Sequence, residues 1–419
     1  MKIGDFAKKF STNANTVRYY VNAGLLIPER HNSQYRFTRQ CEEDMALIRL
    51  LKQFDFSIPE IHELLSLKRL SNLSAKDDIA DYLDILEHKR GVLKAEISRL
   101  EQATDELEKY TESIRRLGDL QAVKAKKLGV PLEFMRILCC PSCESALNLT
   151  DAQVVGGQIM NAGVSCACGY QAVIKNGMFI TNGRDISELD SPDVDRKFYK
   201  DLPLSWVTLF ERSYNWMFNR MKGMRLGGKV MLENHINCYF FLYRYIVMQS
   251  LDQGDYYIIS DKYPEMVALY KELIEQQNLD VKILFLADSS FKYPIRKNCV
   301  DIYVDYCSTN EYSIFNTKNQ LFDIVMPYLK PNADVLGTYF YFDHNSASHA
   351  HLLREYPICL PQNYYIEHLE SVVKSHPLRL LCQEELGYVD EAGSANRNFT
   401  FHVAGDRMYL RSFHYLVKP

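Results

Sequence analysis

The sequence predicts a multidomain protein of the α + α/β class, and three observations support this fold class. Apolar residues recur at helical spacing through 79–117, five cysteines crowd into 139–168, and strand-like and helix-like segments alternate from residue 229 onward. A chain of 419 residues has room for two to four domains. The expected domain bounds are 1–75, 76–120, 136–182 and 183–419.

The composition is ordinary for a globular protein, with 47% hydrophobic and 24% charged residues. A net charge of −4 argues against a uniformly basic surface that coats nucleic acid. Residues 1–40 nevertheless hold seven lysines and arginines against Asp5 and Glu29, an excess of five positive charges at one end of the chain. Because there is no signal peptide and no apolar run long enough to span a bilayer, we expect a cytoplasmic protein without membrane contact.

The first 75 residues predict two short helices joined by a tight turn. The first helix covers 3–10, and the capping residues at 11–13 precede a second helix that contains 16–20 and ends at Gly24. Two such helices form a helix-turn-helix, whose second helix can enter a DNA major groove. Residues 28–37 form a turn between extended segments rich in Arg and Tyr, which we interpret as a β wing. Two further helices are expected at 42–54 and 60–67.

The next segment predicts one long helix. From 79 to 117 the apolar spacing alternates four and three residues, which is the repeat of a coiled coil over about five heptads. Arg90, Thr104 and Thr111 interrupt this seam, and polar seam residues usually fix register and partner number. A lone helix would leave the stripe in water, so we predict a dimerisation helix at 76–120. A helix packed on its own chain is the alternative.

Several stretches of this N-terminal part occur in a characteristic order. They are Thr16–Tyr20, Gly24–Leu26, Tyr35–Phe37, Phe56–Ile61 and the long helix. In order and spacing they resemble the MerR family of transcriptional regulators, and the resemblance covers residues 1–117. Asp55 departs from the family pattern, in which glycine usually precedes the phenylalanine, and we expect a changed helix junction there within an intact fold.

The resemblance implies a homodimer that binds palindromic double-stranded promoter DNA and acts with RNA polymerase when an effector changes its state. Arginine is well shaped for guanine edges and phosphates, and tyrosine hydroxyls anchor phosphate oxygens. A structural role is the alternative for each residue taken singly, and for Tyr20 we expect packing or a backbone contact. The DNA-binding residues implied by position are Thr16, Arg18, Tyr19, Tyr20, Tyr35 and Arg36.

The cysteine cluster has the spacing of a metal site. Cys140 and Cys143 form a C-x-x-C pair, and Cys166 and Cys168 form a C-x-C pair further along the chain. Four thiolates on two turns predict a structural zinc ion, because they leave no open position for water. Cys139 is either a substitute ligand or a free thiol. Reduced cysteines without metal are the alternative.

Residues 170–180 have a strand–Asn-Gly–strand pattern typical of a hairpin. Together with the cysteines, the segment 136–182 resembles the zinc ribbon that precedes the catalytic domain of some rRNA guanine methyltransferases. That resemblance implies that a methyltransferase-type domain follows.

The C-terminal part predicts alternating strands and helices after an aromatic, helix-prone segment at 191–224. The alternation predicts a doubly wound sheet, in which ligands bind at the carboxyl ends of the strands. The expected strands are 229–234, 255–260, 281–286, 300–306 and 334–342, and the expected helices are 240–250, 264–277 and 316–328.

This order resembles a class I S-adenosylmethionine-dependent methyltransferase. Asp261 ends the second strand and Asp288 follows the third. The resemblance implies that Asp261 would hold ribose hydroxyls and that Asp288 would lie near adenine.

The loop after the first strand departs from the family. Glu233 keeps an acidic residue there, but no glycine-rich loop follows it. Asn234, His235 and Asn237 carry Cβ atoms where the cofactor would press on the backbone, so we expect a blocked or reshaped cofactor pocket. For His235, a satisfied polar residue at a strand end is the alternative to a functional role.

We therefore expect a MerR-like dimeric regulator whose degenerate methyltransferase-like domain senses a small-molecule effector without catalysis. The alternatives are an active methyltransferase that modifies RNA or a small molecule, and S-adenosylmethionine sensing without turnover; the missing glycines disfavour this cofactor in both. The histidines His344, His349 and His351 could indicate a metal site, but we interpret them as part of a solvated loop. The expected effector-binding residues are Glu233, Asn234, His235, Asp261 and Asp288.

Overall fold

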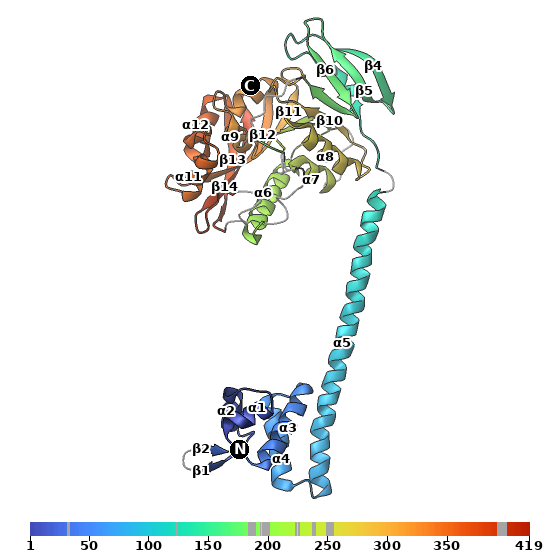
Figure 1. Ribbon diagram of the computed structural model, residues 1–419. Helices are drawn as coiled ribbons and strands as arrows, with labels where there is room; N and C mark the ends of the chain where they lie inside the picture. Colours follow the sequence, from blue (N-terminus) through green and yellow to red (C-terminus); the bar gives the residue numbers. More distant parts are fainter. Residues whose placement is uncertain are drawn as a thin grey trace. The chain divides into compact units, whose positions relative to one another are not determined.

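The computed structural model shows two compact units, Met1–Leu117 and Gly118–Pro419, each with its own hydrophobic core (Figure 1). The structure describes residues 1–31, 34–122, 125–182, 190–192, 194, 202–222, 224, 227–236, 240–248, 255–391 and 400–419. Several residues of the expected elements lie outside the described ranges: Asn32 and Ser33 of the wing, 193, 195–201 and 223 of the aromatic segment, Asn237–Tyr239 after the first strand, and 249–250 of the expected helix 240–250.

The N-terminal unit begins with the predicted helix-turn-helix, formed by α1 (Ile3–Lys9) and α2 (Ala14–Asn22). Asn13 caps α2, because its side-chain oxygen accepts a hydrogen bond of 2.8 Å from the amide of Thr16. The antiparallel strands β1 (Glu29–His31) and β2 (Gln34–Arg36) form the wing. The predicted winged helix-turn-helix is confirmed.

The helices α3 (Arg39–Gln53) and α4 (Ile58–Ser71) complete this unit. Ser57 and Glu60 form a capping box at the start of α4, which is why the helix begins there despite Pro59 at its second position. Asp55 between the helices has a φ of +59°, the left-handed conformation that glycine adopts most readily. The fold is thus retained with an aspartate at the strained position.

Hydrogen bonds from the Arg69 side chain, which were not predicted from the sequence, connect α4 to the rest of the unit. The guanidinium of Arg69 donates to the Asp44 carboxylate at 2.7 Å and to the carbonyl oxygen of Gly24 at 3.0 Å. It also donates to the carbonyl oxygen of Leu25. Because Gly24 and Leu25 directly follow α2, Arg69 fixes the end of that helix against α3 and α4.

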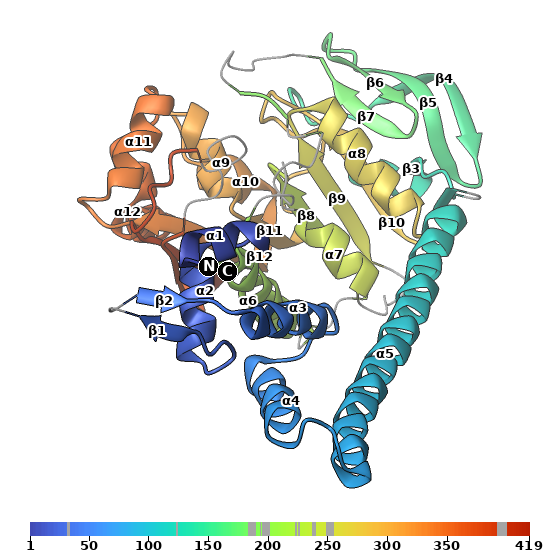
Figure 2. The ribbon, with the colours of Figure 1, turned by 60° about the horizontal axis from the view of Figure 1, so that its bottom comes forward.

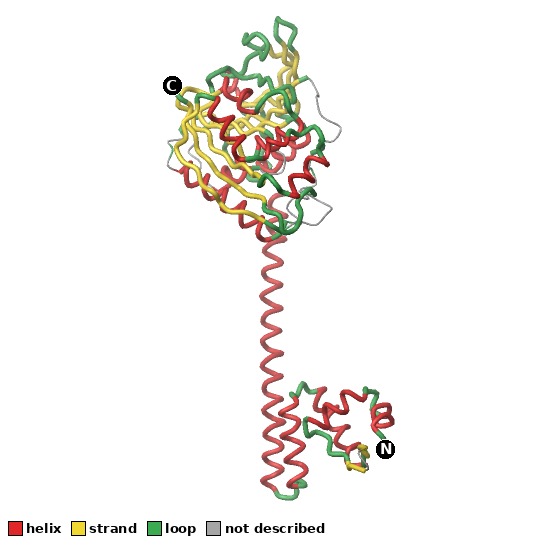
Figure 3. Tube along the Cα trace, turned by 90° about the vertical axis from the view of Figure 1, so that its left-hand side faces the viewer, coloured by secondary structure: helices red, strands yellow, loops and turns green. Residues whose placement is uncertain are grey.

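The long helix α5 (Lys76–Ala122) runs without interruption for 47 residues (Figure 3), which corresponds to about 70 Å. Its first turns pack on the N-terminal core through Tyr82 and Leu86. Further along, the predicted seam is exposed, and Leu107 and Ile114 are 64% and 50% exposed. The described chain therefore leaves the apolar stripe of α5 without a partner over most of its length.

The C-terminal unit is built on one sheet whose described part has twelve strands. Their order is β13-β14-β12-β11-β8-β9-β10-β7-β6-β5-β3, with β4 paired to β5. The strands before the doubly wound part are β3 (Val130–Pro131), β4 (Asn148–Val155), β5 (Gln158–Ser165), β6 (Gln171–Lys175) and β7 (Met178–Thr181). The others are β8 (Val230–Asn234), β9 (Tyr256–Asp261), β10 (Lys282–Ala287), β11 (Val300–Tyr306), β12 (Leu329–Phe342), β13 (Leu378–Val389) and β14 (Met408–Val417).

Five neighbouring strands, β10-β9-β8-β11-β12, are all parallel, and in chain order they read third, second, first, fourth, fifth. This is the doubly wound arrangement, in which the chain switches direction beside β8 and opens a crevice at the strand carboxyl ends. β14 is antiparallel to both β12 and β13. The sheet order is that of a methyltransferase-type Rossmann fold, so the predicted fold class is confirmed.

The helices of this part are α6 (Leu204–Lys222), α7 (Phe241–Met248), α8 (Pro264–Glu275), α9 (Ser308–Phe315), α10 (Leu321–Val325), α11 (Ala347–Glu355) and α12 (Ile366–Ser375).

The prediction of a single helix at 316–328 was wrong. A helix starts earlier, at Ser308, because Cys307 turns the backbone with a φ of +58°. The carboxylate of Asp305 then accepts hydrogen bonds from the amide and hydroxyl of Thr309. After α9, the chain forms a second short helix, α10, that continues as a 3-10 turn through Met326–Tyr328.

The predicted hairpin is present, with Asn176 and Gly177 at φ values of +50° and +76° between β6 and β7. β7 then pairs in parallel with β10, where Met178 lies opposite Phe285 and Ile180 opposite Ala287. The cysteine-bearing ribbon therefore continues the doubly wound sheet beyond β10 (Figure 2).

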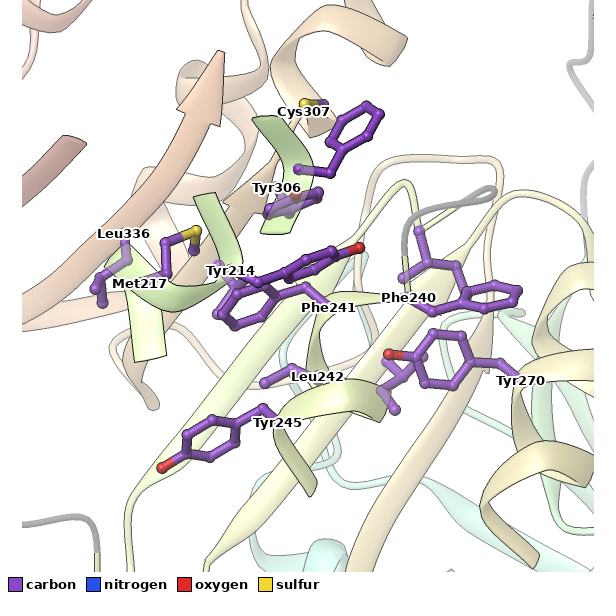
Figure 4. Packing of buried hydrophobic residues seen from close by; sticks show 14 of the residues in the cluster. Tyr214, Met217, Phe240, Phe241, Leu242, Tyr245, Tyr270, Tyr306, Cys307 and Leu336 are labelled. Atoms are coloured by element: carbon purple, nitrogen blue, oxygen red, sulfur yellow. The ribbon is translucent and has the colours of Figure 1, made fainter. Parts of the chain in front are cut away.

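One face of the sheet is covered by aromatic side chains from α6 and α7 (Figure 4). The rings of Tyr214 and Tyr306 stack with centroids 4.6 Å apart, and Phe241 packs against both. The guanidinium of Arg244 lies 3.8 Å from the Tyr214 ring centroid. Both tryptophans of the chain, Trp206 and Trp216, lie in α6.

Among the described residues, no helix combines the length and apolar character that a membrane span requires.

Candidate functional site

The second helix of the N-terminal unit, α2, presents polar side chains to solvent. Arg18 is exposed, and its guanidinium donates to the side-chain oxygen of Asn15 at 2.9 Å. Tyr19 is 54% exposed, and Thr16 is half-buried beside the capping residue Asn13. These three side chains lie on the helix that the resemblance assigns to the DNA groove.

The remaining residues of the predicted DNA surface divide into two groups. Tyr20 and Tyr35 are half-buried and pack on the N-terminal core, so their rings also hold the unit together. Arg36 is exposed on β2, and the guanidinium of Arg30 lies 5.8 Å from the Tyr35 ring. The wing thus carries two exposed arginines next to a partly buried tyrosine, one paired with it across the strands and one following it in the chain, while contact of any of these residues with DNA stays a prediction.

The four predicted metal ligands lie together. The sulfur atoms of Cys140, Cys143, Cys166 and Cys168 are all within 4.8 Å of one another. Sγ of Cys140 is 3.4 Å from that of Cys168, and Sγ of Cys143 is 3.5 Å from that of Cys166. A tetrahedral zinc–thiolate centre with bonds of about 2.3 Å requires sulfur separations of roughly 3.8 Å. The donor set and spacing therefore fit a zinc ion.

Two backbone turns hold these thiols. The amide of Glu144 donates to the carbonyl oxygen of Cys140, and the amide of Gly169, with a φ of +96°, donates to that of Cys166. Cys139 is buried outside the cluster, where its amide donates to the carbonyl oxygen of Pro294 and burial raises the pKa of its thiol. The structure thus groups the four predicted ligands and leaves Cys139 apart.

Glu233, at the end of β8, is buried and binds the start of α7. Its carboxylate accepts hydrogen bonds of 2.9 Å from the amides of Phe241 and Leu242, and one of 3.0 Å from the hydroxyl of Tyr270. Burial raises the pKa of Glu233 to about 7, against the opposing effect of these donors. The carboxylate acts as a helix cap, with both oxygens already engaged.

Asn234 is likewise engaged within the protein. Its amide nitrogen donates to the hydroxyl of Tyr293 at 2.9 Å, and its side-chain oxygen accepts from the hydroxyl of Tyr303 at 2.9 Å. The hydroxyl of Ser308 donates to its backbone oxygen. The next residue, His235, has a φ of +48° and lies buried against two aromatic rings.

The ring of His235 stacks on Phe291 and meets Tyr312 edge-on, each with a centroid distance of 5.5 Å. Burial lowers the pKa of His235 to about 4, so the imidazole is neutral at pH 7. The described residues at the end of β8 therefore form a filled, hydrogen-bonded layer.

Asp261 and Asp288 lie side by side at the ends of β9 and β10, because the amide of Asp288 donates to the carbonyl oxygen of Asp261. One carboxylate oxygen of Asp261 accepts from the amide of Tyr263. One carboxylate oxygen of Asp288 accepts from the hydroxyls of Thr181 and Ser290 at 2.6 and 2.7 Å. The second oxygen of Asp288 is buried without a hydrogen-bond partner among the described residues, and burial raises the pKa of this carboxyl.

A pocket of about 810 Å³ opens next to this layer. It is lined by residues 289–292, which follow β10, and by residues of and after α9. Phe291 and Tyr312 form part of its wall and also contact His235. None of the five predicted effector residues lines the pocket, although His235 contacts Phe291 and Tyr312 and Asp288 accepts a hydrogen bond from Ser290. The lining residues were not among the candidates predicted from the sequence.

The two units have different folds. The N-terminal unit is a winged helix-turn-helix followed by a long helix, and the C-terminal unit is a methyltransferase-type sheet extended by a four-cysteine ribbon. Residues 1–68 match the family described as MerR HTH family regulatory protein, and residues 43–110 match MerR, DNA binding. The mercuric resistance operon regulatory protein of Bacillus cereus is 31% identical over 78 residues, or 18% of this chain and 59% of that protein. The N-terminal unit is thus a MerR-type helix-turn-helix domain, and the match spans just over half of that relative.

Solved structures resemble the two units separately. A SAM-dependent methyltransferase from Aquifex aeolicus is similar over 54% of this chain and 100% of its own, with 14% identity and a TM-score of 0.36. A protein assigned to the MerR family of transcriptional regulators from Listeria monocytogenes is similar over 27% of this chain and 86% of its own, with 23% identity and a TM-score of 0.23. At these scores, the methyltransferase-type assignment depends on the strand order itself.

Proposed function

We propose that the protein is a dimeric, DNA-binding transcription regulator whose methyltransferase-type unit senses a small molecule without catalysing methyl transfer. The observation that carries the DNA-binding part is the exposure of Arg18 and Tyr19 on α2 beside the Arg-bearing wing. These groups have the chemistry for guanine edges and phosphates. The excess of positive charge in residues 1–40 adds a favourable field for DNA.

The exposed seam of α5 supports a homodimer. Side chains such as Ile97, Leu100 and Leu107 each expose more than half of their surface in the single chain. Two copies of α5 would bury this stripe, because heptad-spaced apolar residues pack as knobs into holes. A dimer would place two helix-turn-helix domains on one DNA molecule, which suits a palindromic operator.

The filled end of β8 supports sensing without catalysis. Glu233 caps α7, Asn234 bonds Tyr293 and Tyr303, and the described loop that follows has no glycine. A cofactor that presses on the backbone at this point would have to displace buried, satisfied side chains, at a cost of about 1–3 kcal/mol for each orphaned donor. The ribbon cysteines would hold a structural zinc ion, which would fix their two turns.

Two observations favour a second function, an active S-adenosylmethionine-dependent methyltransferase. The strand order is methyltransferase-type, and Asp288 offers a buried carboxylate oxygen without a partner among the described residues. Asp261 stands at the neighbouring strand end. The engaged side chains at the end of β8 argue against this function.

The regulator proposal is tested by selecting bound fragments from random double-stranded DNA with the full-length protein, followed by gel retardation. We expect one palindromic motif, and for Arg18→Ala a loss of about 1–3 kcal/mol in binding free energy if the side chain contacts a base. The matched control is Arg99→Ala, which removes an exposed arginine of α5 outside the seam. Unchanged affinity of Arg18→Ala would refute the groove role, and no selected motif would refute the regulator.

A further inference from the structure

The pocket next to α9 lies at the carboxyl ends of β10 and β11, where doubly wound sheets place ligands. Its volume of about 810 Å³ falls within the ~300–1,000 Å³ of small-molecule sites. The lining comes from two separate segments, 289–292 and 312–324, so the pocket depends on the folded unit.

Aromatic rings form the apolar wall of this pocket. Phe291 and Tyr312 stand nearly perpendicular, with ring centroids 5.2 Å apart, and Phe315 lies one helical turn beyond Tyr312. Ile324 adds an aliphatic side chain. Flat apolar walls of this kind favour a ring system, which can pack face-on or edge-on against them.

The charged groups of the lining are all positive. Lys292 and Lys318 line the pocket, and no Asp or Glu does so. Within the described residues neither lysine takes part in an ion pair. Three acidic residues, Asp288, Glu311 and Asp323, directly precede lining residues in the sequence but do not line the pocket themselves. Asp288 accepts hydrogen bonds from the hydroxyls of Thr181 and Ser290, and Asp323 is bound to His376 and to the amide of Gln320. The remaining polar lining consists of serine, threonine and asparagine side chains, of which Ser290 and Asn316 already donate hydrogen bonds within the protein.

We infer that this pocket binds a small aromatic anion, a molecule with one or two rings and a carboxylate or phosphate group, and that such a molecule is the effector. The rings would lie against Phe291, Tyr312 and Phe315, and the anionic group would pair with Lys292 and Lys318. S-adenosylmethionine carries a sulfonium cation, so its reactive centre has the wrong sign for this lining. The effector assignment rests on the proposed regulator function, whereas the binding chemistry does not.

The test is calorimetric titration of the full-length protein with three probes: 1-naphthoate, 1-naphthyl phosphate and the neutral 1-naphthalenemethanol. We expect both anions to bind and the neutral probe to bind at least ~10-fold more weakly, because a charge-assisted hydrogen bond is worth roughly that factor. Lys292→Ala and Lys318→Ala should each weaken anion binding by about 5–10-fold. The matched control is Lys297→Ala, because Lys297 lies on the loop after β10 but pairs with Glu144 outside the pocket.

Equal binding of the anionic and neutral probes would overturn the inference, as would the absence of anion binding or an equal effect of Lys297→Ala. A second readout is gel retardation of the selected DNA with and without 1-naphthyl phosphate, in the wild type and in Lys292→Ala. We expect a shift in DNA affinity that is lost in Lys292→Ala, and an unchanged affinity would overturn the effector assignment. Failure to select any DNA refutes the regulator but leaves the calorimetric result on the pocket intact.

Discussion

Replacing Glu233 by alanine tests whether this carboxylate is a structural cap. The substitution leaves the amides of Phe241 and Leu242 and the hydroxyl of Tyr270 without their acceptor, in a region where all three residues are at most 1% exposed. At about 1 kcal/mol or more for each orphaned donor, we expect a loss of roughly 3 kcal/mol in the free energy of unfolding at pH 8.

The loss at Glu233 should also depend on pH. Because the pKa is raised to about 7 in the folded chain, from about 4.5 in the unfolded chain, the folded state binds the proton more tightly between these values. The contribution of Glu233 is therefore largest below pH 4.5 and is lost as the pH rises through 7. From pH 8 to pH 5 the cost of Glu233→Ala should grow by about 2.5 kcal/mol.

The assay is urea unfolding followed by tryptophan fluorescence. Both tryptophans, Trp206 and Trp216, lie in α6, so the signal reports the C-terminal unit alone. The matched control is Glu265→Ala, which removes an exposed acidic residue from the first turn of α8 and should cost about 0.5 kcal/mol at both pH values. A loss below 1 kcal/mol that is equal at both pH values would show that Glu233 is not the cap and is open to a ligand.

Three further predictions concern other parts of the chain. Arg69→Ala should destabilise the N-terminal unit by roughly 3 kcal/mol, as measured by far-UV circular dichroism, because the buried Asp44 loses its ion-pair partner and keeps only the hydrogen bond from Gln40. The exposed Arg39→Ala should have little effect. Burial lowers the pKa of His235 to about 4, so as the pH falls below 6.5 the unfolded chain binds a proton that the folded chain does not, and the folded state loses stability. From pH 7.5 to pH 5 the free energy of unfolding of the wild type should fall by about 2 kcal/mol more than that of His235→Asn. An equal dependence of the two proteins' unfolding free energies on pH would contradict this. Zinc analysis should give one metal per chain, and Cys168→Ser should lower both metal content and the urea midpoint.

The elements that were predicted correctly from the sequence are those determined by residues close together in the chain. Asn13 as a cap, the heptad spacing of α5 and the Asn176-Gly177 dipeptide each act within a few residues of the chain, so their structures could be predicted without knowledge of the rest. The C-x-x-C and C-x-C pairs placed four thiols on two turns, and the structure brings the two turns together.

The missed features depend on pairings between distant residues. The parallel pairing of Met178 with Phe285 joins segments more than 100 residues apart, and no local pattern announces that the ribbon extends the sheet. The hydrogen bonds from Arg69 to Asp44 and to Gly24 likewise join residues that are far apart in the sequence. The start of α9 was missed because it depends on the side chain of Asp305 rather than on apolar spacing.

The candidate ligand site shows the same division. The strand pattern placed Glu233, Asp261 and Asp288 at the carboxyl ends of neighbouring parallel strands, where the structure also has them, while their role in binding an effector stays a prediction. Whether such a side chain can still bind a ligand depends on its hydrogen-bond partners within the protein. The partners of the Glu233 and Asn234 side chains come from four other elements or loops, which the strand pattern does not predict. The pocket itself is lined by loop residues whose spacing carries no signal.

The central claim is that the methyltransferase-type unit no longer uses S-adenosylmethionine. Calorimetric titration of the zinc-loaded, full-length protein with S-adenosylmethionine and with S-adenosylhomocysteine tests it most directly. We predict no binding of either compound at millimolar concentration, because engaged side chains fill the end of β8. Micromolar binding of either compound would contradict the claim and make methyl transfer the next activity to assay.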